Sequence, residues 1–181
     1  MENLVYAIVL LPLIGFVING LFGKSLPKAL VGGLATLVVF AAFLISVSIF
    51  IGFPADGTPV IVKAFEWFTI GGIQVNFGFQ IDQLSLMMMM IVTGIGSLIH
   101  LYSIGYMSHD KGFYKFFTYL NLFIFSMLLL VMGSNYLILF IGWEGVGLCS
   151  YLLIGFWYEN TEYGKAARKA FIMNRIGDLG L

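Results

Sequence analysis

The chain has 181 residues, of which 60% are hydrophobic, 17% aromatic and only 10% charged, and its formal net charge is zero. This composition excludes a soluble globular domain, and the lack of a basic excess argues against a nucleic-acid partner. The single cysteine, Cys149, lies in an apolar stretch and supports neither a disulfide framework nor a metal cluster. The sequence therefore predicts an all-α integral membrane protein, built as a multi-spanning helix bundle.

Apolar runs long enough to cross a bilayer as helices recur along most of the chain. The first four are expected at about residues 3–22, 29–51, 82–106 and 112–132. The first run lacks a basic leader and a cleavage site, so we expect a retained membrane helix rather than a signal peptide. Asp82 followed by Ser85 indicates a capped start for the third helix.

Residues 60–81 carry a different pattern. From Ile73 to Ile81, apolar and polar residues alternate with the period of a half-buried strand. Gly71 and Gly72 come directly before this segment and supply a two-residue turn. We therefore expect a short β-hairpin between helices two and three, outside the hydrocarbon core, with Trp67 suited to the membrane interface.

The fifth apolar run, from about Asn135 to Trp157, contains one ionisable residue, Glu144, close to its middle. A charged side chain at the bilayer centre costs roughly 2.5–3.5 kcal/mol on insertion scales, so such residues usually serve a function. Two interpretations remain open. Glu144 is either a structural acid that pairs with a buried cation and fixes helix register, or a titratable station on a proton or cation path.

Small residues in the same run predict close helix packing. Gly142, Gly145 and Cys149 share one helix face, where the backbone of a neighbouring helix can approach. Glu144 points roughly 100° or more away from the centre of that face. The very short turn at residues 133–135 predicts that helices four and five are antiparallel neighbours.

Beyond the fifth run, a charged loop is expected from Glu159 to Lys169, and a sixth apolar segment from Ala166 to Leu181. This segment is too short to cross a bilayer comfortably, so we expect the last helix to be incomplete and the chain to be a piece of a longer protein. Arg175 and Asp178 lie three residues apart, close enough to pair on a helix. Their pair is either a packing or subunit-interface salt bridge or part of a charge relay, and these roles are compatible.

His100 lies in a polar stripe along the third helix, which should face protein or water rather than lipid. Its members are Thr93, Gly96, Ser97, His100 and Ser103. Three interpretations remain open: a core histidine, a proton-relay group between Glu144 and the inner surface, or an axial haem ligand together with His109.

The basic residues predict the orientation of the chain in the membrane. Seven of the nine lie in or next to the loops after odd-numbered helices: Lys24, Lys28, Lys111, Lys115, Lys165, Arg168 and Lys169. Lys63, in the predicted hairpin, lies on the opposite side. We therefore expect the amino terminus and the hairpin outside, and the three charged loops on the cytoplasmic or matrix side.

Four segments together resemble the antiporter-like membrane subunits of respiratory NADH:quinone oxidoreductase, complex I. They are residues 78–85, 93–103, 142–156 and 169–178. The resemblance covers essentially the whole chain and corresponds to the amino-terminal third of such a subunit. It is most specific from Trp143 to Tyr151 and is closest to the largest such subunit, at the far end of the membrane arm. The large subunit of multisubunit sodium/proton antiporters resembles the chain less closely.

The resemblance implies three leading helices followed by two inverted five-helix repeats, each with a broken helix. Residues 1–107 would hold the leading helices and the hairpin, and residues 108–181 would open the first repeat with helices four to six. It also implies that Glu144 pairs with a lysine on a seventh helix. Arg175 and Asp178 match positions near the contact with a neighbouring antiporter-like subunit.

From this resemblance we expect a non-redox subunit that moves protons across an energy-transducing membrane, bacterial inner or mitochondrial inner. Glu144 would take up and release the proton, with His100, Arg175 and Asp178 as candidate relay or interface charges. We expect no cofactor and no metal in this chain; NADH, FMN, iron–sulfur clusters and quinone would be bound by other subunits. The partners would be other membrane-arm subunits and the lipid bilayer. A sodium/proton antiporter subunit and a purely structural membrane scaffold are the alternatives.

Overall fold

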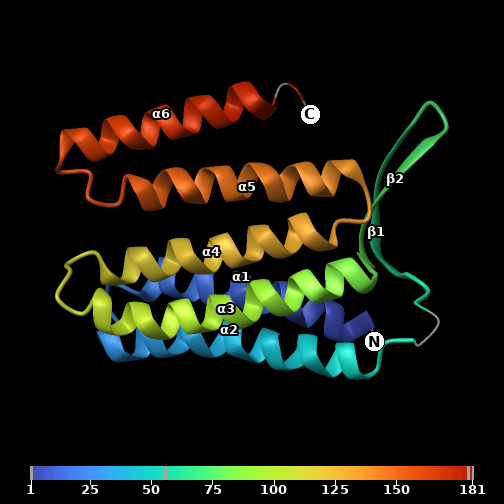
Figure 1. Ribbon diagram of the computed structural model, residues 1–181, viewed down its shortest axis with the longest axis horizontal. Coiled ribbons are helices and arrows are strands. Elements are labelled where there is room, and N and C mark those ends of the chain that lie inside the picture. Colours follow the sequence, from blue (N-terminus) through green and yellow to red (C-terminus); the bar gives the residue numbers. More distant parts are fainter. Residues whose placement is uncertain (1, 55–56, 179, 181) are drawn as a thin grey trace.

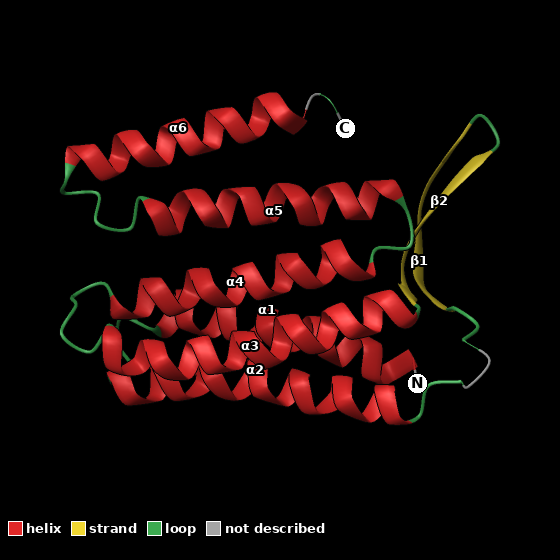
Figure 2. Cartoon of the chain, viewed as in Figure 1, coloured by secondary structure: helices red, strands yellow, loops and turns green. Residues whose placement is uncertain are grey.

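Six helices and one β-hairpin form the part of the chain that the computed structural model describes, residues 2–54, 57–178 and 180 (Figure 2). The helices are α1 (Glu2–Phe22), α2 (Lys28–Ile51), α3 (Gln83–Tyr106), α4 (Phe113–Met132), α5 (Tyr136–Ile154) and α6 (Thr161–Asp178), and the strands are β1 (Val60–Ile70) and β2 (Ile73–Ile81). This order confirms the predicted multi-spanning helix bundle with a hairpin between its second and third helices.

Five of the described helices, α1 to α5, are long and apolar enough to cross a membrane, judged by length and composition. The helices α1 to α4 pack around a shared apolar core that includes Ile8, Val39, Met89 and Leu128. The helix α5 packs on α4, and α6 packs on α5, so the bundle continues as a layer away from that core (Figure 1). The protein is therefore an all-α multi-pass membrane protein.

Glycines bring α4 and α5 into close contact, as the sequence predicted. A Cβ on Gly142 would lie 2.4 Å from the backbone nitrogen of Leu130, and a Cβ on Gly145 would lie 2.5 Å from Ser126 Oγ. Cys149 is fully buried on the same face of α5. The predicted antiparallel packing of the fourth and fifth helices is confirmed, because Gly142 and Gly145 meet residues in descending order along α4.

The hairpin is built as predicted, with Gly71 and Gly72 at its turn. Their φ angles of 59° and 89° lie in the left-handed region that glycine adopts readily. The base of the hairpin is fastened to the turn between α4 and α5. There, Ser134 N–H donates to the Gly78 carbonyl at 3.2 Å, and Asn135 Nδ2 donates to the Asn76 carbonyl at 2.7 Å.

The charged stretch that follows α5 is helical, which corrects the sequence prediction. The sixth helix begins at Thr161, not near Ala166, so most of the loop expected from Glu159 to Lys169 belongs to α6. The Asn160 side chain accepts the Glu162 N–H, and Glu162 pairs with Lys165 one turn later at 2.8 Å. Such local pairs stabilise a helix that is not hydrophobic. The prediction relied on apolar runs, so it put the start of α6 too late in the sequence.

The fifth helix also ends earlier than predicted, at Ile154 rather than near Trp157. Gly155 follows as its C-cap and donates its N–H to the Tyr151 carbonyl at 3.0 Å. The apolar residues Phe156 and Trp157 therefore belong to the connection between α5 and α6.

The third helix starts with a capping box, which confirms the predicted role of Asp82. Asp82 Oδ1 accepts the Ser85 N–H at 2.7 Å, and Ser85 Oγ accepts the Asp82 N–H at 2.7 Å. The backbone N–H of Ser85 is the largest influence on the pKa of Asp82, which it holds below the ordinary value of 3.8 because it stabilises the charged carboxylate.

We predict that Asp82→Ala lowers the free energy of unfolding by about 1 kcal/mol, because it removes the cap. Asp82→Asn keeps an acceptor and should stay near the wild type at neutral pH. The pKa of Asp82 is lower in the folded state than its ordinary value of 3.8, so the charged carboxylate stabilises the fold above pH 3.8. That stabilisation is lost as the pH falls through the folded-state pKa. Thermal unfolding of the full-length protein in detergent should show this acid-dependent loss in the wild type and less of it in Asp82→Asn. Equal acid sensitivity would contradict the prediction.

We predict that Gly142→Ala destabilises the protein by about 1–3 kcal/mol, because the added methyl group forces α4 and α5 apart. Gly33→Ala is the matched control, since a Cβ there meets no atom within 4 Å. Alanine also favours the helix, so that variant should keep or slightly raise the melting temperature. Thermal unfolding of both variants in detergent checks the difference, and equal stability would contradict the proposed close contact.

Candidate functional site

Glu144 lies near the middle of α5, on the side that faces α6, where it forms an ion pair with Arg175. Its side chain is 22% exposed and that of Arg175 is 34% exposed. A glycine makes room for this contact: a Cβ on Gly147 would lie 2.7 Å from the Asn174 side chain. The ion pair places Arg175 at the level of the middle of α5.

The Arg175 guanidinium is shared by two carboxylates. Besides Glu144, it lies 3.8 Å from Asp178 Oδ2, which confirms that Arg175 and Asp178 are close enough to pair. Its other neighbour is the ring of Phe171, whose centroid is 4.6 Å from the guanidinium carbon. Two carboxylates therefore share the Arg175 guanidinium, so Glu144, Arg175 and Asp178 together carry one more negative than positive charge when both acids are ionised.

Asp178 is held by a residue that the sequence analysis did not assign to the site. Trp143 Nε1–H donates to Asp178 Oδ1 at 2.6 Å, while Asp178 Oδ2 has no hydrogen-bond partner among the described residues. The site thus joins two consecutive residues of α5, Trp143 and Glu144, to two charges of α6. A sequence signal for Trp143 existed, because an indole N–H in an apolar span usually finds a partner.

A hollow of about 440 Å³ lies between α4, α5 and α6 and is lined by sequence neighbours of the ion pair, among them Trp143 and Asn174. It is lined by Met127, Leu130, Trp143, Val146, Gly147, Ser150, Tyr151, Ala170, Phe171 and Asn174. Its wall is apolar apart from a hydroxyl, a phenol and an amide. It is large enough for several water molecules or for a further side chain.

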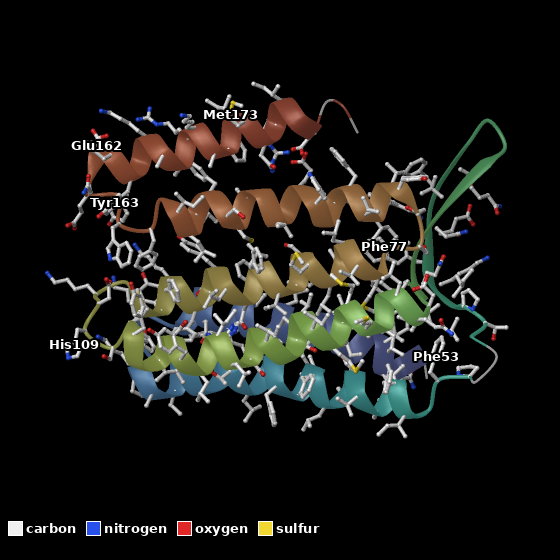
Figure 3. All side chains as sticks on the ribbon, viewed as in Figure 1. Phe53, Phe77, His109, Glu162, Tyr163 and Met173 are labelled. Atoms are coloured by element: carbon white, nitrogen blue, oxygen red, sulfur yellow. The ribbon has the colours of Figure 1, made fainter. Side chains whose placement is uncertain are left out.

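His100 is not part of this cluster. It lies in α3, is fully buried, and contacts the Gly96 carbonyl through Nδ1 at 2.8 Å. His109 is exposed in the loop at one end of the bundle, next to Ser108 (Figure 3). The two histidines therefore occupy different environments. The polar stripe on α3, predicted to face protein or water rather than lipid, faces protein: Thr93, Gly96, Ser97, His100 and Ser103 are all buried.

The predicted segregation of basic residues is confirmed, because the loops after α1, α3 and α5 meet at one end. Lys28 Nζ donates to the carbonyls of Ser108 and Asp110, and Trp157 Nε1 donates to the Asp110 side chain at 2.8 Å. The Gly112 N–H and then the Trp157 N–H hold the pKa of Asp110 below its ordinary value. Lys63 lies in the hairpin at the opposite end (Figure 1). These contacts between loops were not predicted.

These features define a class of protein: a multi-pass membrane protein with an ion cluster between neighbouring helices at mid-span. Two family models match the chain. "NADH-Ubiquinone oxidoreductase (complex I), chain 5 N-terminus" matches residues 67–117, and "NADH:quinone oxidoreductase/Mrp antiporter, TM" matches residues 133–181.

Curated relatives match over nearly the full length of this chain. NADH-quinone oxidoreductase subunit L of Campylobacter jejuni is 50% identical over 100% of this chain and 29% of that protein. Subunit L of Mycobacterium tuberculosis is 48% identical over 97% of this chain and 28% of that protein. NADH-ubiquinone oxidoreductase chain 5 of Hypocrea jecorina is 39% identical over 95% of this chain and 25% of that protein. The chain thus spans less than a third of the length of these relatives.

The fold also matches a chain in the structure of the membrane-bound sulfane sulfur reductase, an archaeal respiratory membrane complex. The TM-score is 0.81 at 17% identity, over 96% of this chain and 34% of that chain, so the likeness concerns the fold alone. The family models, which together match more than half of the chain, and the curated relatives show that the chain belongs to the antiporter-like membrane subunits of NADH:quinone oxidoreductase, complex I. Such subunits are found in bacterial or mitochondrial respiratory membranes.

We predict that Arg175→Met destabilises the full-length protein because it leaves two neighbouring carboxylates without their cation. Adding Glu144→Gln should restore part of the loss, with a coupling of about 0.5–3 kcal/mol between the two positions. The measurement is thermal unfolding of the single and double variants. Arg168→Met is the matched control, because Arg168 is exposed and contacts the Gly164 carbonyl of its own helix at 3.4 Å. Additive effects at 144 and 175 would contradict the pairing.

Proposed function

We propose that the full-length protein is a proton-translocating membrane-arm subunit of NADH:quinone oxidoreductase and that Glu144 is the residue that takes up and releases the proton. Family membership supports the first part. The observation that carries the second is the sharing of one guanidinium, that of Arg175, between Glu144 and Asp178. A cluster with more acids than cations holds a carboxyl whose charge depends on where the cation lies.

Arginine keeps its proton under all ordinary conditions in proteins, so the exchange must occur at a carboxyl group. A guanidinium close to Glu144 favours the charged carboxylate, and its movement toward Asp178 favours a proton on Glu144. In the proposed cycle, the carboxylate oxygen of Glu144 forms an O–H bond with a proton delivered by water, and that bond breaks when the cation returns. The lysine that the resemblance implies on a seventh helix would serve as a second, movable cation for Glu144.

Arg175 and Asp178 also suit a subunit contact. The outer face of α6 exposes Ile172, Met173 and Ile176, each more than half exposed, and Figure 3 shows Met173 turned away from α5. We propose that this face meets a neighbouring antiporter-like subunit, so that the neighbour can displace the Arg175–Asp178 pair. In this proposal the amino terminus and the hairpin lie outside. The redox cofactors and the quinone are bound by other subunits, and this chain supplies charges and a proton path.

A second candidate is the large subunit of a multisubunit sodium/proton antiporter. One observation favours it: the model that matches residues 133–181 describes Mrp antiporters together with NADH:quinone oxidoreductases. Purification of the full-length protein with its natural partners separates the two, because only complex I contributes redox subunits.

We predict that Glu144→Gln leaves the complex assembled and lowers proton pumping by about half or more relative to NADH oxidation, because glutamine cannot carry the proton. The measurement is proton uptake by membrane vesicles, set against the rate of NADH oxidation. Glu162→Gln is the matched control, since the Glu162 side chain is 72% exposed and its carboxylate pairs with Lys165 one turn along the same helix. Unchanged coupling in Glu144→Gln would remove Glu144 from the proposed path. Loss of assembly alone would favour the structural-scaffold alternative.

A further inference from the structure

A second polar cluster lies in the core of the α1–α4 bundle and is not used by the site at Glu144. Asn19 from α1, His100 from α3 and Asn121 from α4 are all fully buried. Four of their polar atoms have no hydrogen-bond partner among the described residues: Asn19 Oδ1, His100 Nε2, Asn121 Nδ2 and Asn121 Oδ1. We propose that these three side chains hold internal water, with Nε2 of His100 as the ring atom that faces it.

Close approach of α1 to α4 holds the Asn121 carboxamide beside the His100 imidazole, with Asn19 on the neighbouring turn of α1. A Cβ on Gly15 of α1 would lie 2.8 Å from Asn121 Nδ2, so this glycine leaves room for the Asn121 side chain against α1. Asn19 is one helical turn farther along α1. The Asn121 carboxamide also neighbours the His100 ring, which packs beside Phe117 with 6.1 Å between ring centroids.

The backbone fixes the tautomer of His100. Its Nδ1 contacts the Gly96 carbonyl oxygen, which can only accept a hydrogen bond, so Nδ1 must carry a proton. In the neutral ring, Nε2 is then an acceptor with a lone pair directed into the cluster. In this arrangement Nε2 is the ring nitrogen that can accept a hydrogen bond from another group.

Direct contacts within the cluster cannot satisfy it. Asn19 Nδ2 already donates to the Val31 carbonyl at 3.3 Å. If Asn121 Nδ2 turned to donate to His100 Nε2, the side-chain oxygens of Asn19 and Asn121 would still be two acceptors without a donor among the described residues. Water supplies donors to such atoms, and buried water typically makes about three hydrogen bonds to otherwise unpaired groups. Bare polar atoms in a bundle core are costly, so hydration is the simplest way to complete this cluster.

Solvent lies near this cluster. A groove of about 1040 Å³ at the charged end of the bundle reaches Val31, the residue that binds the Asn19 amide. The Asn121 carboxamide beside the ring can turn its oxygen toward His100 Nε2 when that nitrogen carries a proton.

Solid-state NMR of the full-length protein, labelled with ¹⁵N-histidine and assembled in its complex in liposomes, tests the proposal. The difference spectrum between wild type and His100→Gln isolates the His100 signals. We expect a protonated Nδ1, an unprotonated Nε2 at neutral pH, and magnetisation transfer from water to the ring. A ring protonated at Nε2 alone, or no transfer from water, would overturn the proposal.

A second variant keeps the test independent of His100→Gln folding. Asn121→Leu removes one carboxamide, so the water signal at His100 should weaken at least severalfold while its Nδ1–H is kept. Thr118→Val is the matched control: Thr118 is buried one turn away on α4, and its hydroxyl is already paired with the Tyr114 carbonyl at 2.8 Å. An unchanged water signal in Asn121→Leu would overturn the proposed site. Neither result bears on Glu144, which lies on the opposite side of α4.

Discussion

The placement of one guanidinium between two carboxylates is the interaction on which the rest of this structure depends. Three separate charges at mid-span would cost roughly 8–10 kcal/mol on insertion scales, so α5 and α6 can hold Glu144, Arg175 and Asp178 only if they stay together. The ion cluster therefore dictates how α6 lies against α5. It also leaves the cluster with two carboxylates for one guanidinium, the imbalance on which the proposed protonation of Glu144 rests.

The glycines of α5 make that arrangement possible. Gly142 and Gly145 bring α5 against α4, while Gly147, on another side of the helix, admits Asn174 beside Arg175. In a membrane, where lipid is as apolar as leucine, close backbone approach replaces the hydrophobic effect as a source of helix association. The same few residues thus set the position of α5 from both sides, with its acid directed toward α6 and its small residues directed toward α4.

Much of this could be predicted from the sequence, because its signals are local. Runs of apolar residues predicted the five spans, alternation and Gly71–Gly72 predicted the hairpin, and the i,i+3 spacing predicted that Arg175 and Asp178 are close.

Other features were predicted wrongly or not at all. The start of α6 was misplaced because its first turns are held by charge pairs, which a search for apolar runs does not register. The contact between Glu144 and Arg175 was not predicted, since it depends on the register of α6 along α5. Asn19 and Asn121 were overlooked, although single amides inside apolar helices are a recognisable signal of buried polar contacts.

The hairpin has a mechanical consequence. Its second strand runs directly into the capped start of α3, and its base is bonded to the turn between α4 and α5 through Gly78 with Ser134 and Asn76 with Asn135. The two-stranded hairpin therefore connects the start of α3 to the turn that precedes α5, the helix that carries Glu144. If α5 slides along its own axis, either these two bonds break or the hairpin tilts with it, so a displacement that begins in the middle of α5 is carried to the hairpin end of the bundle.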